Sequence, residues 1–430
     1  MTPVPQAPII RLDCKAQSYD WGKVGSSSKV AKFASSSHTL SVDESRPYAE
    51  LWMGTHPNAP STLYQSDRTL ESVLTEHPEL STPHFHERYH GHLPFLFKVL
   101  SIAKALSIQA HPDKELAERL FKDRPDLYKD NNHKPEMAIA LTEFEALCGF
   151  KPLNEIADAL DQWPEFLAVV GENEARSFQQ VVRHSDEQAG RQALRSLFKT
   201  LMTANTTKVE QELDRLVQRL EAQAAKYERK SFEEVLLRTN SQFPGDVGVF
   251  CLFFLNYIVL EPGQAVFLAA NEPHAYLSGD CVECMAASDN VVRAGLTPKF
   301  KDVEVLTDML TYETKSSTEQ LLSGVLCTPT GHSLLYDPPI EEFSIILTKL
   351  NHANERERLR SVEGPSVVIV TRGEGVIRSE RQVDGQDEAE VKAETGSVFF
   401  VGANTPFSIE ATSDEGLTIY TAYTIKPNNE

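Results

Sequence analysis

This sequence of 430 residues lacks the long apolar runs that mark membrane proteins. Its longest apolar run, Val247–Leu260, is interrupted by Gly248 and Asn256 and is too short to span a bilayer. The opening MTPVPQAPIIRLD has no basic stretch followed by an apolar segment, so no secretory signal is visible. We therefore expect a cytoplasmic protein with no membrane partner.

Cysteine and basic residues are also scarce. Six cysteines are scattered through the chain, and without an export signal we expect them to be reduced. Cys281 and Cys284 form a lone C-x-x-C pair, and because a four-thiolate zinc site needs a second pair, we predict that they pack in a core. The formal net charge of −20 disfavours nucleic acid and anionic membranes as partners, whereas a small anionic substrate needs only a few local cations.

The chain is longer than one hydrophobic core usually serves, so we expect two or three domains. Short apolar stretches bounded by polar residues predict β-strands on both sides of the middle of the chain. These stretches are Leu93–Leu100, Leu106–Ala110, Met137–Thr142 and Val247–Leu260. Past about residue 323, β-like runs alternate with turns, and Arg372–Gly375 and Gln382–Glu390 are predicted hairpin loops.

Residues 153–245 differ in character, because glycine becomes rare and apolar residues fall at helical spacing. One helix face is predicted to carry Val209, Leu213, Leu216 and Leu220. Thr207 with Glu210 three residues later predicts a capping box at the start of that helix. We interpret the segment as a helical insertion that scaffolds or covers one end of a β core.

An internal similarity links two distant β segments. Gly263–His274 matches Gly396–Phe407 without a gap, with glycine, asparagine and proline at one constant offset. Each segment consists of a turn glycine, a predicted buried strand and an Asn-x-Pro turn. This similarity predicts two copies of one β-barrel unit. The first copy ends in a potential metal ligand, His274, and the second in Phe407, which cannot bind metal. The alternative is a chance similarity between two β turns.

Three short motifs supply potential metal ligands. Gln109 and His111 are two apart in a predicted strand and would project from the same face. The proline between Lys134 and Glu136 biases the chain towards an extended conformation, so these two side chains should also face the same way. With His274, the set of two histidines, one glutamate and one glutamine suits zinc or another divalent ion. Taken singly, each motif also fits an ordinary hydrogen-bonded histidine or a solvated turn.

A fourth motif, from Ser288 to Lys299, combines a glycine with two cations, Arg293 and Lys299. Arginine offers a planar fork to phosphate and lysine a compact charge, so this loop could bind a phosphate-ended substrate. The alternative is surface charge on a loop.

Several long motifs in one order resemble those of the type I phosphomannose isomerases. They are YDWG from Tyr19, YAELWMGTHP from Tyr48, QAHPDKE from Gln109, YKDNNHKPEMAIAL from Tyr128, NEPHAYLSGDCVECMAASDN from Asn271 and VRAGLTPK from Val292. The resemblance covers almost the whole chain and is weakest after Ser323. It implies a mainly β fold with a helical insertion, made of two cupin-type (double-stranded β-helix) barrels and an α-helical domain. The implied boundaries are 1–152 with 246–322 for the metal-bearing catalytic barrel, 153–245 for the insertion and 323–430 for a metal-free barrel.

The resemblance also implies roles for individual residues. Its zinc ligands, one ion per chain, fall on Gln109, His111, Glu136 and His274. Its catalytic arginine falls on Arg293, and other pocket positions fall on Ser107, Lys134, Tyr276, Glu283, Asp289 and Lys299. As a hypothesis, Glu283 is the base, with Asp289 as the alternative. Lys134 and Tyr276 would orient hydroxyls or relay protons, while Arg293, Lys299 and Ser107 would hold phosphate or screen negative charge.

The implied function is interconversion of mannose 6-phosphate and fructose 6-phosphate through an enediolate, feeding GDP-mannose synthesis and glycosylation. The implied partner is a small sugar phosphate, and we expect a monomer. Two other functions compete with this one. They are an iron-dependent oxygenase on a cupin-type barrel, and a sugar-phosphate-binding barrel protein without activity.

Overall fold

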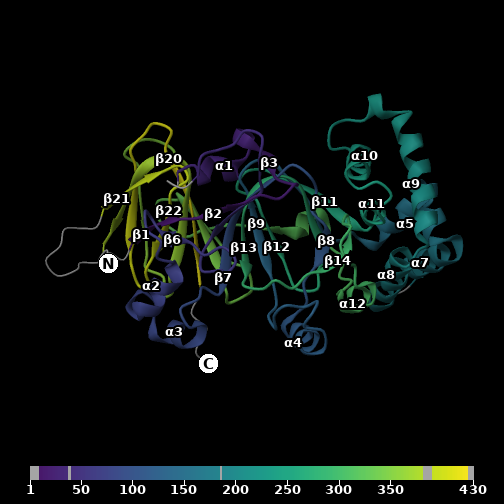
Figure 1. The fold of residues 1–430 in the computed structure, drawn as a ribbon. Helices are drawn as coiled ribbons and strands as arrows, with labels where there is room; N and C mark the ends of the chain where they lie inside the picture. The colour runs from purple at the N-terminus through teal and green to yellow at the C-terminus, as the bar shows by residue number, and fades with distance from the viewer. Residues whose placement is uncertain (1–8, 37–39, 185, 381–389, 425–430) are drawn as a thin grey trace.

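The structure is a computed structural model that describes residues 9–36, 40–184, 186–380 and 390–424. Two β regions and one helical region lie in a row (Figure 1). The C-terminal β region is at the left, the first β region is in the centre and the helices are at the right. The predicted fold class, mainly β with a helical insertion, is confirmed.

The first barrel is an eleven-stranded antiparallel sheet. Its strands are β2 (Lys15–Gln17), β5 (Glu50–Met53), β7 (Phe95–Ile102), β8 (Ile108–Ala110), β9 (Glu136–Ala140), β10 (Phe144–Phe150), β11 (Leu255–Leu260), β12 (Ala265–Leu268), β13 (His274–Ala286), β14 (Val292–Gly295) and β15 (Leu321–Leu322). The long strand β13 pairs with β7, β8, β9 and β10, so it joins the segments that carry the predicted ligands.

The second barrel is also an eleven-stranded sheet, and it includes strands from the start of the chain. Its strands are β1 (Ile9–Asp13), β6 (Thr62–Leu63), β16 (Val325–Leu326), β17 (Ser333–Tyr336), β18 (Ser344–Leu350), β19 (Arg356–Leu359), β20 (Ser366–Ser379), β21 (Glu390–Glu394), β22 (Val398–Val401), β23 (Phe407–Ala411) and β24 (Leu417–Tyr423). Strand β1 pairs with β22, with Ile9 opposite Val401. The N-terminal segment therefore links the two barrels.

The helical insertion packs against the first barrel. Its helices are α5 (Leu153–Gln162), α6 (Pro164–Val170), α7 (Glu172–His184), α8 (Glu187–Met202), α9 (Thr206–Glu221) and α10 (Phe232–Gln242), with the 3₁₀ turn η3 (Ala224–Lys226). The predicted apolar face of α9 is confirmed, because all four of its residues are buried. The predicted capping box is wrong. The cap is Asn205, whose side chain accepts from Lys208 N at 3.2 Å, since asparagine is a strong N-cap and lies just before the first helical residue.

Smaller elements complete the chain. They are α1 (Lys29–Ala34), α2 (Leu70–Glu76), α3 (Pro83–Tyr89), α4 (Lys114–Asp123), α12 (Val303–Met309), the two-residue strands β3 (Lys23–Val24) and β4 (Pro47–Tyr48), and the 3₁₀ turns η1 (Gly25–Ser27), η2 (Pro78–Leu80) and η4 (Ser317–Gln320). Among the described residues, no helix combines the length and apolar character that crossing a bilayer requires.

Two further sequence predictions about local structure are wrong. The run Val247–Leu260 begins as a helix, α11 (Gly248–Cys251), and becomes extended only at Leu255. Its side chains from Val249 to Leu255 are all buried in the hydrophobic cluster that includes the insertion, and burial on all sides removes the periodicity that separates helix from strand.

The second error concerns Arg372–Gly375, which is not a hairpin loop but part of the long strand β20. The pairing of β20 with β24 shifts register between Val370 and Arg372, and Gly373 has φ +80°. Gly373 therefore permits an irregularity within the strand and does not mark the end of the strand. The predicted loop Gln382–Glu390 lies outside the described residues apart from Glu390, the first residue of β21.

The internal similarity is confirmed as a structural repeat. The turn glycines Gly263 and Gly396 both have φ +92°, and Asn271 and Asn404 have φ +63° and +54°. The strands β12 and β22 follow at the same offset, and β13 begins at His274 as β23 begins at Phe407. Left-handed backbone at both positions explains why glycine and asparagine recur there.

The C-x-x-C pair is packed, as predicted. Cys281 and Cys284 lie on β13 and are fully buried, in two different hydrophobic clusters. Residues three apart in a strand point to opposite faces, so the two thiols cannot share a ligand.

Candidate metal centre and active site

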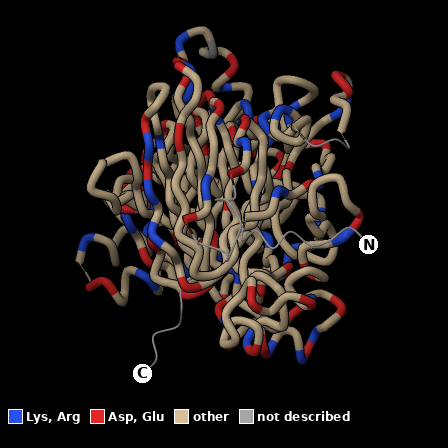
Figure 2. Tube along the Cα trace, turned by 90° about the vertical axis from the view of Figure 1, so that its left-hand side faces the viewer, with Lys and Arg blue, Asp and Glu red and all other residues tan. Residues whose placement is uncertain are grey.

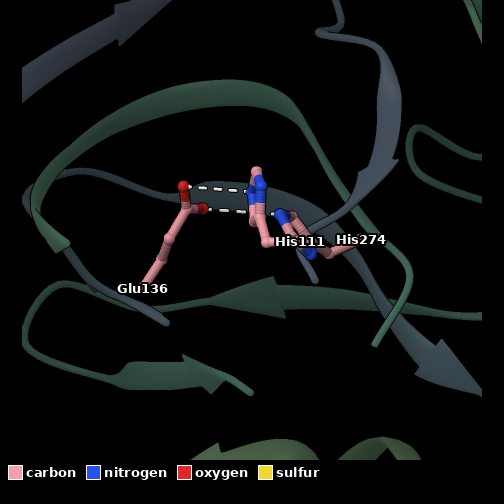
Figure 3. A group of neighbouring side chains, drawn as sticks. All are labelled: His111, Glu136 and His274. Atoms are coloured by element: carbon pink, nitrogen blue, oxygen red, sulfur yellow. Dashed lines mark ion pairs between the residues drawn. The ribbon is translucent and has the colours of Figure 1, made fainter. Parts of the chain in front are cut away.

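Three strands of the first barrel bring two imidazoles and a carboxylate together. His111 follows β8 directly, while Glu136 and His274 are the first residues of β9 and β13. Nε2 of His111 lies 3.2 Å from Oε1 of Glu136, and Nε2 of His274 lies 3.4 Å from Oε2 (Figure 3). The three ligand atoms all lie within 4.8 Å of one another. This spacing suits ligands of one metal ion.

The second nitrogen of each imidazole is held by the backbone. Nδ1 of His111 lies 2.6 Å from the carbonyl oxygen of Asn290, and Nδ1 of His274 lies 3.1 Å from that of Glu272. Each Nδ1 must donate to its carbonyl, so in the neutral ring the lone pair of Nε2 faces Glu136. This is the tautomer that a metal-binding histidine needs.

The facing atoms have no other partner. Within the described part of the chain, Nε2 of both histidines and Oε2 of Glu136 are buried without a hydrogen bond. Burial lowers the pKa of His111 to about 4, so this ring is neutral at pH 7 and able to bind metal. Burial alone would raise the pKa of Glu136, but the positive charge of the Lys134 ammonium beside it helps to hold that pKa well below its usual value. A divalent cation would satisfy all three orphaned atoms, so the residues fit zinc.

Gln109 lies opposite His274 in the pairing of β8 with β13, and opposite Arg293 in the pairing of β8 with β14. Opposite residues of antiparallel strands project from the same face. The register therefore gathers Gln109 and Arg293 on the side of the sheet that carries His274. Coordination by Gln109 stays a prediction.

Beside the ligands is a buried ion cluster that the sequence analysis missed. Nζ of Lys98 lies 3.3 Å from Oε2 of Glu283 and 3.7 Å from Oε2 of Glu50, and all three residues are at most 9% exposed. The indole of Trp52 donates to Glu50, and the Lys98 ammonium lies 5.2 Å from the indole centroid. The sequence feature that could have revealed this cluster is Lys98, a lysine inside the otherwise apolar run LPFLFKVL.

This cluster places a carboxyl group with a shifted pKa, that of Glu283, next to the metal ligands. Lys98 and Glu283 are opposite each other in the pairing of β7 with β13. Burial raises the pKa of Glu283 above its ordinary value, more than the Lys98 ammonium lowers it. A raised pKa makes the carboxylate of Glu283 a better proton acceptor than an ordinary exposed carboxylate.

Tyr276 and Lys134 border the same space. Tyr276 follows His274 by two residues on β13, and among the described residues its buried hydroxyl has no hydrogen-bond partner. Burial, with the charges of Glu283 and Glu136, raises its pKa well above the usual value, so the phenol stays protonated. Nζ of Lys134 lies 3.3 Å from Oε1 of Glu136.

The remaining predicted residues lie nearer the surface. Asp289 is exposed, and its Oδ1 lies 3.8 Å from Nε2 of His56, whereas Glu283 is buried. Arg293 and Ser107 are half-buried and Lys299 is exposed. Within the described residues, neither the guanidinium of Arg293 nor the amine of Lys299 has a partner, which leaves two cations free for an anion.

Comparisons with known proteins agree over most of the chain. The model of the phosphomannose isomerase type I catalytic domain matches residues 9–153, that of the helical insertion domain residues 169–255 and that of the C-terminal region residues 333–379. A mannose-6-phosphate isomerase of Schizosaccharomyces pombe is 46% identical over 96% of this chain and 99% of its own length. One from Homo sapiens is 42% identical over 96% and 98%.

Solved structures give the same result. The apo form of a mannose 6-phosphate isomerase from Salmonella typhimurium aligns with a TM-score of 0.80 at 29% identity, covering 98% of this chain and 100% of its own. A zinc-bound mannose 6-phosphate isomerase aligns with a TM-score of 0.80 at 28% identity and the same coverage.

Proposed function

The chain belongs to the type I phosphomannose isomerase family, and from that premise we propose that it interconverts mannose 6-phosphate and fructose 6-phosphate at a zinc ion through an enediolate. The observation that carries the proposal is the set of three orphaned ligand atoms on His111, Glu136 and His274. The proposed ligands are Gln109, His111, Glu136 and His274.

The reaction moves a carbonyl between two neighbouring carbons, so a proton must leave one carbon and arrive at the other. When bound, zinc supplies a positive charge that stabilises the negative charge developing on the substrate oxygens. Glu283 is the proposed base, because its buried carboxyl has a raised pKa and lies beside the ligands. Lys98 is a positioning residue, since its ammonium holds that carboxyl at 3.3 Å.

The other side chains would bind and orient the substrate. Tyr276 has a protonated hydroxyl without a partner among the described residues, so it can donate to a sugar oxygen or relay a proton. Arg293 screens the developing charge, and Lys299 with Ser107 holds the phosphate. Binding energy from the remote phosphate then positions the reacting end. Lys134 orients a sugar hydroxyl next to Glu136.

A coupled assay for fructose 6-phosphate formed from mannose 6-phosphate, with metal analysis on the same sample, tests this function. Dialysis against a strong chelator should abolish isomerisation and added zinc should restore it, while dialysis without chelator should leave activity unchanged. Full activity in metal-free protein would refute the role of zinc. Oxygen uptake with iron, in place of isomerisation, would support the oxygenase instead.

The wider role follows from the substrate. We propose that the product feeds mannose activation to GDP-mannose and thereby glycosylation. The cytoplasmic location, the monomeric state and the domain boundaries stay predictions.

A further inference from the structure

A cavity of about 420 Å³ lies at the junction of the two barrels. Helix α1 contributes Lys29 and Lys32, and the first barrel contributes Leu141 and Pro262. The second barrel contributes Lys349 from β18, Arg372 from β20, and Glu415, Thr418 and Tyr420 from nearer the end of the chain. The volume is within the range of small-molecule sites.

The lining is basic, although the chain as a whole is acidic. Four cations line the cavity against one carboxylate, that of Glu415, whereas acidic residues outnumber basic ones 62 to 42 in the whole chain. Figure 2 shows acidic and basic residues interspersed over the face nearest the C-terminal barrel. Among the described residues, the side chains of Lys29, Lys32, Lys349 and Arg372 form no ion pair or hydrogen bond. Lys32, Lys349 and Arg372 are exposed and Lys29 is half-buried, so water weakens their mutual repulsion, but four like charges around one hollow still favour an anion there.

The two barrels approach closely at this place. Lys349 reaches from the second barrel to the turn before β12, where its Nζ would lie 3.3 Å from a Cβ at Gly263. Tyr420 and Thr418 are 3% and 9% exposed, and within the described chain their hydroxyls make no hydrogen bond. The cavity thus combines free cations with free hydroxyl donors.

The cavity is separate from the metal centre. Leu141 lines it immediately after the last residue of β9, and Glu136 is the first residue of that strand. Five residues of extended chain span about 16 Å. The adjoining hollow has the opposite charge, because it is lined by Glu374 and Glu394. These carboxylates disfavour an anion in the adjoining hollow, although Arg11, 3.2 Å from Glu394, neutralises part of their charge.

We propose that this inter-barrel cavity binds a small phosphorylated anion with at least two negative charges. Phosphate oxygens would accept from the Lys29, Lys32 and Lys349 ammonium groups, and the Arg372 guanidinium would offer its fork. The bound anion would join α1 to the second barrel by bridging the cations that each contributes. The proposal rests on charge and shape at this junction and does not depend on the proposed isomerase function.

Titration calorimetry of the full chain with inorganic pyrophosphate tests this site. K349Q/R372Q should weaken binding by about a hundredfold, because it removes two charge-assisted hydrogen bonds that each contribute about tenfold in affinity. The matched control K15Q/R360Q removes the same charge from exposed positions outside the cavity and should bind like the parent chain. Glu415→Gln should tighten binding, an effect that a folding defect cannot imitate.

A Lys299→Ala variant distinguishes this site from the substrate site. It should retain pyrophosphate binding at the cavity, and K349Q/R372Q should retain isomerase activity. Equal affinity of K349Q/R372Q and the parent chain, or no pyrophosphate binding by the parent chain at millimolar concentration, would overturn the proposal.

Discussion

At the scale of single residues, the site depends on polar groups that burial has removed from water. The His111, Glu136 and His274 side chains converge with orphaned ligand atoms, which is unfavourable unless a cation binds. Lys98, in contrast, is compensated by Glu50 and Glu283 on both sides. The unpaired atoms of His111, Glu136 and His274 are therefore placed to bind a cation. Lys98 instead positions the proposed base.

The metal centre can be tested with His274→Ala. We expect zinc affinity to fall by more than about a hundredfold, because even changes to the partners of metal ligands cost about 10–100-fold. Isomerisation should be lost while the circular dichroism spectrum is retained. His84→Ala, at an exposed position on α3, is the control and should keep both metal and activity. Undiminished zinc content in His274→Ala would exclude it as a ligand.

The phosphate site can be tested with Lys299→Ala. Loss of one charge-assisted contact should raise KM for mannose 6-phosphate by about tenfold and change kcat by less than about twofold. Lys301→Ala removes a neighbouring lysine that is paired with Asp246 at 3.8 Å, and it should leave KM unchanged. A fall in kcat without a change in KM would move Lys299 into the chemistry.

At the scale of elements, the same turn–strand–turn motif occurs in both barrels. A left-handed glycine, a short strand and a left-handed asparagine set the direction of the strand that follows, β13 in one copy and β23 in the other. Only the first copy begins that strand with a metal ligand. Strand β13 then continues past β7, β9 and β10, and thereby connects the ligands to Glu283.

The attachment of the insertion to the barrel depends on Glu145 of β10. Its carboxylate accepts from Arg238 of α10, from Tyr257 at 2.7 Å and from Ser278 at 2.9 Å. Burial would raise the pKa of Glu145, but these donors outweigh burial and the pKa is lowered. We expect Glu145→Gln to reduce the free energy of unfolding by about 1–3 kcal/mol at pH 7.

The stability lost in Glu145→Gln should depend on pH, being largest near neutral pH and smaller in acid. The ionised carboxylate contributes its full stability above the unfolded-state pKa of 4.5 and loses it as pH falls through the lower folded-state pKa. Denaturant unfolding should therefore show the difference between Glu145→Gln and the parent chain closing below about pH 4.5. The exposed neighbour Glu143 pairs with Arg229 at 3.8 Å, and Glu143→Gln should cost less than about 1 kcal/mol at any pH. A difference in unfolding free energy between Glu145→Gln and the parent chain that stays constant down to pH 3 would contradict this role of Glu145.

At the scale of the whole molecule, the two barrels share one core. A single hydrophobic cluster contains Phe97 and Met137 from the first barrel and Phe343 and Ile345 from the second. The insertion packs in another cluster, with Phe198 against Phe150 of β10. The barrels should therefore unfold together, although they are separate in sequence.

Phe97→Ala tests this coupling. Removal of a fully buried ring should cost about 3–5 kcal/mol and speed amide exchange in β24 of the second barrel as well as in β7. Phe198→Ala removes an equally buried ring from the insertion and should leave β24 protected. Unchanged protection of β24 in Phe97→Ala would show that the barrels open independently.

The sequence by itself determined the features that local chemistry dictates. The helical insertion, the repeated turn glycines and asparagines, and the three ligand types at His111, Glu136 and His274 all follow from propensity, spacing and ligand chemistry. Where burial is complete, as at Val249–Leu255, the sequence has no periodicity that separates helix from strand, and the prediction of a strand was wrong.

Tertiary structure alone decided which distant residues meet. The pairing of β7 with β13 sets Lys98 against Glu283, and the pairing of β1 with β22 joins the start of the chain to the second barrel. The basic cavity, likewise, exists only where α1 and the two barrels come together. Strand register fixes all of these contacts, and register is an outcome of packing the whole sheet rather than of any one segment.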